Sequence, residues 1–238
     1  MAPRLIASLQ RFGAFSDAEA AAVQTLVTGL REFAAGDDLA IEGGPASPLR
    51  VLLEGQAFRY RTLPDGRRQI LGFLIPGDII DLQSLFLTLD HSIAALTACE
   101  VGLVPRARLV DLIESTPPVA HALWRASLAD AAITREWLVG MGRRSAYGRI
   151  AHLFCEMSLR LRSVGLENHH RCAFPVTQLH LSDALGLSAV HTNRTLQALR
   201  VDNLIAFQSG ELRVLDWPGL RAAGDFDPAY LHLKGATA

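Results

Sequence analysis

The sequence predicts an α+β protein: a strand-rich front half, then a long helix, then a helix–turn–helix with a two-stranded wing. Three observations support this. Residues 33–106 hold short apolar runs cut by Gly, Pro and Asp turn signals. Residues 117–164 are rich in Ala, Leu and Arg and lose that strand texture. Residues 177–200 hold two helix-forming stretches on either side of Gly186.

Composition indicates one large or two small domains, because the 238 residues are 50% hydrophobic and 20% charged. Charges interrupt every long apolar run, so we expect no membrane-spanning helix. The amphipathic N-terminus lacks the apolar core of a signal peptide. Three scattered cysteines fit a reducing cytoplasm, so we expect a cytoplasmic protein without a membrane partner.

Charge is divided unevenly along the chain, although the net charge is only −1. Residues 1–134 hold 11 Arg and 15 acidic residues, whereas residues 135–213 hold 10 Arg and 6 acidic residues. The second region is therefore basic, which favours contact with a polyanion there alone. Chance clustering of charge is the alternative.

The front half begins with a predicted helix over residues 16–33, capped by Ser16. Residues 49–75 read as two strands joined by a hairpin turn at Asp65 and Gly66. Several short strands at this spacing predict a β-sandwich or a β-barrel.

Two helices are predicted after residue 117, with a hinge at Gly140 and Gly142 and the second helix over about 144–163. The first has an apolar sector wide enough for two partners, one of them the same helix of a second subunit. Burial inside a monomer is the alternative. The sector consists of one stripe of Trp124, Leu128, Ala131 and Leu138 and a second of Ala122, Ala126, Ala129 and Ile133.

Residues 164–175 read as a loop. Its His169, His170 and Cys172 are residue types that bind metals, but the short spacing lacks a fourth ligand. A solvated loop is the preferred interpretation, and we predict no metal site.

Residues 177–200 fit a helix–turn–helix. Thr177 is placed to cap a helix that ends near Leu185, Gly186 suits a turn with positive φ, and Ser188 is placed to cap the second helix. The inward face of the second helix is expected to pack on the first. The residues expected in that contact are Leu181, Leu185, Thr192, Leu196 and Leu199.

The outward face of the second helix suits DNA. Arg194 can take both major-groove acceptors of guanine, Asn193 can pair with adenine, and small neighbours allow close approach. Ser209 and Gly210 form a turn between two short strands, which makes a wing. A structural αα-hairpin would explain Gly186 but neither of these features. The candidate DNA-binding residues are Thr177, His180, Ser188, Ala189, Val190, Asn193 and Arg194.

Nearly all of residues 30–233 resembles the Crp/Fnr family of transcription regulators. The resemblance is carried, in order, by "GDDLAIEGGPASPLRVLLEGQ", "IPGDII", "TACEV", "GRIAHLF", the helix–turn–helix and "FDPAYLHL". It implies a homodimer that binds double-stranded DNA at a near-palindromic site, and RNA polymerase as a further partner. The implied parts are a cyclic-nucleotide-binding-type double-stranded β-roll (jelly roll) over 1–116, a dimerisation helix and hinge over 117–142, and a winged helix–turn–helix over 143–238.

The sequence departs from the members of this family that bind cyclic AMP. Their phosphate-binding segments align near "DIIDLQSLF" and near His91, yet residues 69–105 contain no Arg or Lys. A buried phosphodiester would lack a charge-assisted partner, and Asp81 would repel it. We therefore expect some other effector. Its candidate contacts, which ordinary loop residues would also explain, are Asp81, Ser84, His91, Ser92, Thr134 and Arg135.

Other family features are also missing. No cysteine precedes Cys99, which argues against an iron–sulfur cluster, and His91 and His121 give haem no specific support. We predict no cofactor. Val190 stands where the family often carries a Glu that accepts from cytosine, so the preferred half-site should differ.

A sequence-specific transcription regulator is therefore the predicted function. A cupin-type metal enzyme would need several His and a Glu on its strands, whereas residues 36–105 contain one His. The remaining alternative is a regulatory or scaffold protein whose β-roll and winged domain bind other proteins.

Overall fold

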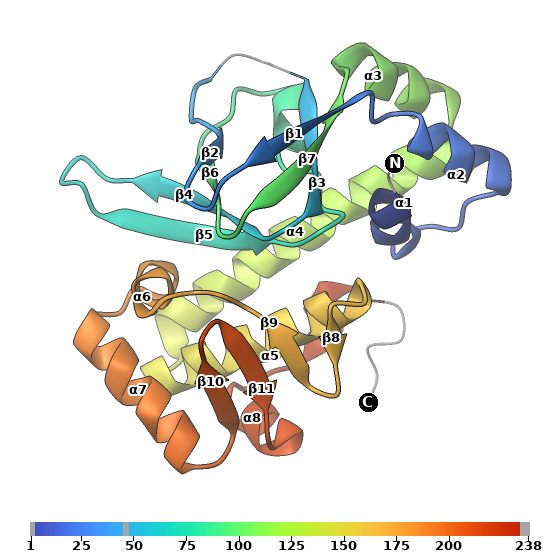
Figure 1. Cartoon of the computed structure of the whole chain (residues 1–238). Coiled ribbons are helices and arrows are strands. Elements are labelled where there is room, and N and C mark those ends of the chain that lie inside the picture. The colour runs from blue at the N-terminus through green and yellow to red at the C-terminus, as the bar shows by residue number, and fades with distance from the viewer. Residues whose placement is uncertain (1–2, 45–47, 234–238) are drawn as a thin grey trace. The chain divides into compact units, whose positions relative to one another are not determined.

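A computed structural model describes residues 3–44 and 48–233 of the chain. The chain divides into two units within helix α4 (Pro117–Arg143), between Leu128 and Ala129, and the short segment Arg68–Ile70 groups with the second unit. Figure 1 labels the elements of both units, which are described separately below.

Two sheets with an apolar core form the body of the first unit. The inward side chains of both sheets, such as Leu52, Ile93 and Val101, belong to one buried cluster. This is the double-stranded β-roll of the predicted α+β fold, which is confirmed. One sheet has the order β1 (Gly29–Phe33), β7 (Cys99–Val104), β3 (Leu49–Glu54). The other has the order β2 (Asp38–Ala40), β6 (Ser92–Ala95), β4 (Ala57–Thr62), β5 (Arg68–Leu74).

Helices close one side of this roll. A second buried cluster joins Leu5, Val23, Leu109 and Val119 of four helices to Val51 of β3. Burial of these apolar side chains is the main force that holds the helices on the sheet. The elements are α1 (Pro3–Gln10), α2 (Asp17–Gln24), the short 3₁₀ helix η1 (Leu82–Leu85), α3 (Arg106–Ser115) and the start of α4.

The predicted helix over 16–33 is wrong in its second half. Ser16 caps α2 as expected, and the Glu19 side chain accepts a hydrogen bond from the Ser16 backbone N–H at 2.7 Å, which completes a capping box. The helix nevertheless ends at Gln24, and Gly29–Phe33 is a strand paired with β7. Pairing with a strand about seventy residues away outweighs the local helical pattern.

The predicted hairpin at Asp65 and Gly66 is confirmed. The Leu63 N–H donates to the Arg67 carbonyl at 2.7 Å across that turn, between β4 and β5. Residues 49–75 hold three strands rather than two, because the chain turns again at Gly55 between β3 and β4.

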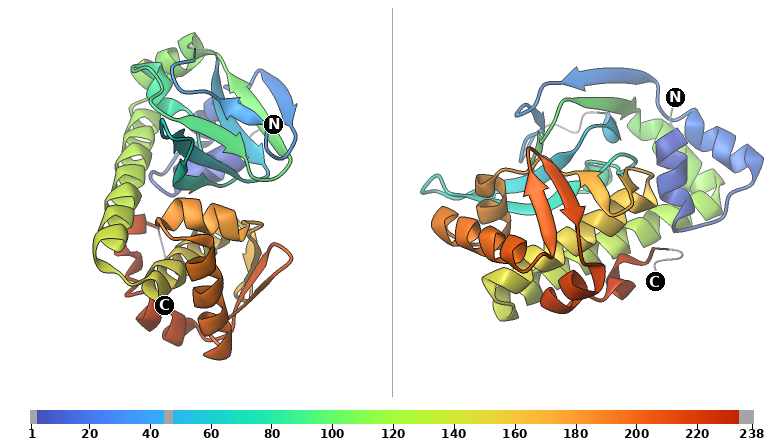
Figure 2. Two further views of the ribbon diagram at one scale, coloured as in Figure 1. Left: turned by 90° about the vertical axis from the view of Figure 1, so that its left-hand side faces the viewer. Right: turned by 60° about the horizontal axis from the view of Figure 1, so that its bottom comes forward.

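The second unit is a winged helix–turn–helix built on α4 and α5. Its sheet has the order β10, β11, β9, β8, and Phe154 of α5 contacts Phe174 and Phe207 in the core. Figure 2 shows the β10–β11 hairpin, here called the wing, as an arm beside α7. The elements are α5 (Ala146–Ser163), β8 (Glu167–Asn168), β9 (Arg171–Ala173), α6 (Gln178–Leu185), α7 (Ala189–Val201), β10 (Ile205–Gln208), β11 (Glu211–Val214), α8 (Trp217–Ala223) and η2 (Pro228–Leu231).

The predicted hinge at Gly140 and Gly142 is displaced, because α4 runs through both glycines to Arg143. A Cβ at position 140 would lie 3.2 Å from Arg144 Nη1, so Gly140 makes room for that guanidinium. The break follows, where the Ser145 hydroxyl caps α5 by accepting from the Gly148 N–H at 3.1 Å.

The predicted loop over 164–175 contains a β-hairpin. His169 and His170 both adopt positive φ in the turn between β8 and β9. Cys172 is buried, and His170 lies 2.9 Å from the Arg162 guanidinium. Within 3–44 and 48–233, no three His, Cys, Asp or Glu side chains are grouped to hold a metal ion. Among the described helices, none has the length and apolar character needed to cross a membrane.

Candidate nucleic-acid interface

Helix α6 begins with an unusual capping box. The Thr177 hydroxyl accepts from the His180 N–H at 3.1 Å, and His180 Nδ1 accepts from the Thr177 N–H at 3.2 Å. Histidine thus takes the place of the usual Glu or Gln. Because Nδ1 must accept, the proton of the neutral ring lies on Nε2. Burial lowers the pKa of His180, which favours this neutral form.

The turn between α6 and α7 agrees with the sequence prediction. Gly186 has φ +63°, a left-handed conformation that costs most other residues about 1–2 kcal/mol. Ser188 then caps α7 by accepting from the His191 N–H at 3.2 Å. This sharp reversal sets the direction of α7.

The inward face of α7 packs on α6 as predicted. Thr192, Leu196 and Leu199 are buried, as are Leu181 and Leu185 of α6. The structure adds one polar contact inside this interface: the hydroxyls of Ser182 and Thr192 are 3.0 Å apart. This packing fixes the orientation of α7 about its own axis. It therefore determines which side chains of α7 face outward.

The outward face near the start of α7 consists of Ala189, Val190, Asn193 and Arg194, here called the reading face. All four are exposed. Among the described residues, no side-chain hydrogen bond engages Asn193 or Arg194. An amide and a guanidinium without partners on an exposed helix face are suited to pair with base edges in a major groove.

The wing follows α7 directly. Ser209 and Gly210 both have positive φ, as a two-residue hairpin turn between β10 and β11 requires. The Arg200 guanidinium of α7 donates to the Phe207 carbonyl of β10. The last turn of α7 is thereby fixed to the wing.

Arg149 of α5 joins the ends of two other helices. Its guanidinium donates to the carbonyls of Arg144 at 3.0 Å, Met141 at 2.8 Å and Leu185 at 2.9 Å. Met141 lies in the last turn of α4, and Leu185 is the last residue of α6. Arg149 is therefore a structural cation rather than a free ligand for phosphate.

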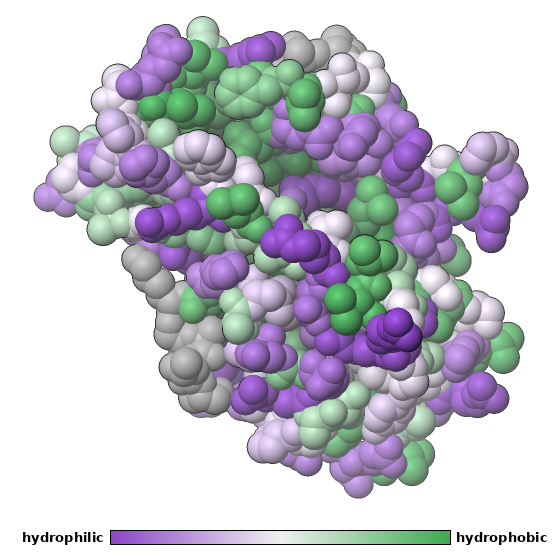
Figure 3. Space-filling model, turned by 180° about the vertical axis from the view of Figure 1, so that it is seen from behind, coloured by the Kyte–Doolittle hydropathy of each residue, from purple (hydrophilic) through white to green (hydrophobic). Residues whose placement is uncertain are grey.

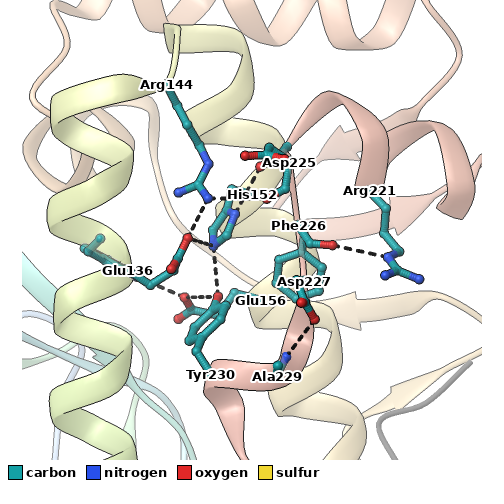
Figure 4. Close-up of polar contacts among 12 residues, drawn as sticks. Glu136, Arg144, His152, Glu156, Arg221, Asp225, Phe226, Asp227, Ala229 and Tyr230 are labelled. Carbon is teal, nitrogen blue, oxygen red and sulfur yellow. Dashed lines mark hydrogen bonds and ion pairs between the residues drawn. The ribbon is translucent and has the colours of Figure 1, made fainter.

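A buried polar cluster joins η2 to α4 and α5. Figure 4 shows Glu136, Arg144, His152, Glu156 and Tyr230 directed toward one another. The Glu156 carboxylate lies 3.0 Å from the Tyr230 hydroxyl, and Arg144 pairs with Glu136 at 2.5 Å. In the same cluster, Trp137 Nε1 donates to Glu156 at 3.0 Å.

His152 lies at the centre of that cluster. Its Nδ1 is 3.1 Å from the Gly224 carbonyl and its Nε2 is 2.9 Å from the Tyr230 hydroxyl. Burial, and then the positive charge of Arg144, lower the pKa of His152. The sequence suggested none of these contacts, because they join residues more than seventy positions apart.

The candidate effector residues do not form one cluster. Asp81 is buried; its carboxylate accepts from the Arg50 N–H at 2.8 Å and from the Arg50 guanidinium at 2.5 Å. Burial raises the pKa of Asp81 even so. Ser84 donates to the Asp81 carbonyl at 2.8 Å. These contacts give Asp81 and Ser84 a structural role in the roll.

The other four candidates have separate partners. Ser92 accepts from the Glu42 N–H at 3.0 Å, and His91 Nδ1 lies 2.7 Å from Asp90. The Nε2 atom of His91 is buried and has no hydrogen-bond partner among the described residues. Thr134 donates to the Asp130 carbonyl at 3.1 Å, and Arg135 beside it is exposed on α4 in the second unit.

The three cysteines are buried and unbonded to one another. Burial raises the pKa of Cys99 and raises the pKa of Cys172 to about 12. Burial also raises the pKa of Cys155. Thiols of this kind are poor metal ligands and poor nucleophiles at neutral pH.

Two protein families match the two units. A model of the cyclic nucleotide-binding domain matches residues 30–116, and a model of the Crp-like helix-turn-helix domain matches residues 148–223. Each match falls on a part whose architecture is described above.

Similar proteins cover most of the chain. The transcriptional activatory protein AadR of Rhodopseudomonas palustris is 30% identical over 174 residues, or 72% of this chain and 71% of AadR. The transcriptional activator FnrL of Cereibacter sphaeroides is 27% identical over 195 residues, covering 81% of this chain and 78% of FnrL. The structure of FixK2 from Bradyrhizobium japonicum matches 83% of this chain and 98% of its own, with 25% identity and a TM-score of 0.75.

The similarity to AadR extends over both units, and the helix–turn–helix keeps the exposed reading face that DNA recognition requires. These findings favour DNA binding over the scaffold alternative. The chain belongs to the Crp/Fnr family and is a DNA-binding transcription regulator, not an enzyme.

Proposed function

We propose that the chain binds a near-palindromic duplex as a homodimer, with α7 of each protomer in the major groove. The observation that carries this proposal is the reading face at the start of α7. We assign Arg194 to a guanine, through two hydrogen bonds, and Asn193 to an adenine. Ala189 leaves room for the backbone of α7 to approach the bases.

Phosphate contacts would come from the starts of α6 and α7. Thr177, His180 and Ser188 lie there, where helix N-termini favour anions. The basic character of residues 135–213 supports this placement.

The dimer would form along α4. Trp124, Leu128 and Leu138 are 69%, 60% and 67% exposed, and Ala131 completes their stripe. In the second predicted stripe, Ala122 and Ala129 are buried and Ala126 and Ile133 are half-buried. In Figure 3, apolar side chains lie exposed among hydrophilic ones on the face seen there. A second copy of α4 would cover the exposed stripe, here called the α4 seam.

The roll would respond to an effector other than cyclic AMP. Arg50 beside η1 already pairs with Asp81, and residues 69–105 supply no further cation for a phosphodiester. We propose that the effector contacts lie near His91 and Ser92, where His91 Nε2 is buried without a partner. Asp81 and Ser84 would shape that region, while Thr134 and Arg135 lie on α4.

Activation of transcription is the proposed output, because the relatives AadR and FnrL are named activators. RNA polymerase is the partner that activation requires, and the cytoplasm is the compartment where both meet DNA. The division of labour would be sensing by residues 1–116, dimerisation by 117–142 and DNA binding by 143–238.

Selection of the full chain against random duplexes tests this function. We expect enrichment of two inverted half-sites, two protomers per duplex and steep weakening of binding with salt. Enrichment of a single unpaired half-site by a monomer would contradict the homodimer. Equal binding of every sequence would contradict base readout by α7.

A further inference from the structure

Two exposed valines stand out on α7. Val190 is 82% exposed and Val201 is 77% exposed, whereas Val23, Val51 and Val101 of the first unit are fully buried. A β-branched side chain is a weak helix former, and an exposed position offers it no packing in return. Val190 therefore has no role in stabilising the described fold.

Val190 lies among the polar members of the reading face. It is the second residue of α7, so Asn193 and Arg194 follow it at i+3 and i+4 and share its side of the helix. Side chains of a helix tilt toward its N-terminus, so Val190 lies at the forward edge of this face. The reading face thus combines a hydrocarbon group with an amide and a guanidinium.

We infer that Val190 reads the C5 methyl group of a thymine, an inference that rests on the proposed function. The major-groove edges of the base pairs carry donors, acceptors and one apolar group, the thymine methyl. Contact between Val190 and that methyl group would bury apolar surface of both groups. Against the amino group of cytosine or adenine, Val190 would remove water from a donor and offer no acceptor.

The position of this thymine follows from helix geometry. Val190 and Arg194 are four residues apart, which is about 6 Å along the axis of α7. Successive base pairs are about 3.4 Å apart. The thymine should therefore lie within about two base pairs of the guanine that Arg194 contacts.

Replacing thymine by deoxyuridine tests the inference, since this removes only the methyl group. Each thymine of the selected half-site is replaced in turn, in both half-sites, and the affinity of the full chain is measured. At one thymine position, loss of the methyl group should weaken binding about fourfold when a single half-site is changed. When both half-sites are changed, binding should weaken about fifteenfold. Val190→Ala should bind the thymine and deoxyuridine duplexes equally.

Val201→Ala is the matched control. Val201 lies eleven residues further on, about three turns of helix, so it points the same way but about 16 Å farther from the start of α7. This variant should keep the full sensitivity to deoxyuridine. The parent should also bind a duplex with a 5-methylcytosine·guanine pair at that position more tightly than one with an unmethylated cytosine·guanine pair. Val190→Ala should show no such preference.

The outcomes separate this inference from the function beneath it. If selection enriches no sequence, base readout fails and Val190 has no role in it. If a half-site is enriched but no thymine is sensitive to deoxyuridine, or the sensitivity survives in Val190→Ala, the thymine contact alone is wrong.

Discussion

At the scale of single residues, His152 couples the stability of the second unit to pH. Its ring is buried among groups from several elements: Glu136 and Arg144, Glu156 of its own helix, and the Gly224 carbonyl. Burial lowers the pKa of His152 below its usual value of 6.5. The folded chain therefore binds fewer protons than the unfolded chain in the range below about pH 6.5.

The change of stability with pH follows from this difference in proton binding. The contribution of neutral His152 to stability is complete above about pH 6.5 and is lost as the pH falls through that value toward the lowered pKa. Each unit of pKa lowering corresponds to about 1.4 kcal/mol. Thermal unfolding from pH 7.5 to 5.5 should show a steeper loss of stability in the parent than in His152→Gln. Parallel losses would show that the cluster does not hold this ring neutral.

Residues of the reading face were predictable, whereas those of the buried cluster were not. Thr192, Leu196 and Leu199 recur with helical spacing, and this alone turns Asn193 and Arg194 outward. Glu156 and Tyr230 meet only because the chain folds back over seventy residues. No local sequence pattern predicts a contact between residues so far apart in the chain.

At the scale of elements, Arg149 holds the helix–turn–helix in place. The last carbonyls of a helix lack partners within that helix, and a cation near them is favourable. Arg149→Met would leave the carbonyls of Met141, Arg144 and Leu185 without this donor. We expect a loss of about 2–4 kcal/mol in unfolding free energy, measured by denaturant unfolding.

The matched control for that change is Arg143→Met. Arg143 is the exposed last residue of α4 and carries the same charge. Its replacement should alter stability by no more than about 0.5 kcal/mol. An equal loss in both variants would mean that net charge, and not the three hydrogen bonds, sets the effect.

Elements with strong local signals were predicted well. Ser188, Gly186 and the turn at Ser209 and Gly210 each lie where the sequence placed them. Strand β1 was missed because β7, its partner, is distant in sequence. The β8–β9 hairpin was missed because a turn of this kind usually contains Asn-Gly, whereas here His169 and His170 adopt positive φ.

At the scale of the whole molecule, the α4 seam predicts self-association. Leu128→Glu would place a charge in the middle of a surface that a second copy should cover. A dimer of this variant would bury two unpaired carboxylates, one from each copy. The cost of removing water from them should raise the dimer dissociation constant by at least about tenfold. Sedimentation velocity over a range of concentrations measures this change.

Leu87→Glu is the control for that variant. Leu87 is exposed to a similar degree but belongs to the roll rather than to α4. It should dimerise like the parent. A parent that stays monomeric at every concentration, or a Leu128→Glu variant that dimerises normally, would contradict the seam.

The central claim is that α7 reads bases rather than merely attracting phosphates, and Arg194→Ala tests it most directly. Affinities of the parent, Arg194→Ala and Arg143→Ala are measured for the selected duplex and for a random one. A bidentate contact to guanine is worth about 1–3 kcal/mol, so Arg194→Ala should bind the selected duplex about 5- to 150-fold more weakly. Its affinity for the random duplex should change by less than about twofold, and Arg143→Ala should affect both duplexes alike. If Arg194→Ala instead weakens both duplexes by the same factor, Arg194 is a phosphate contact and the reading face is wrongly assigned.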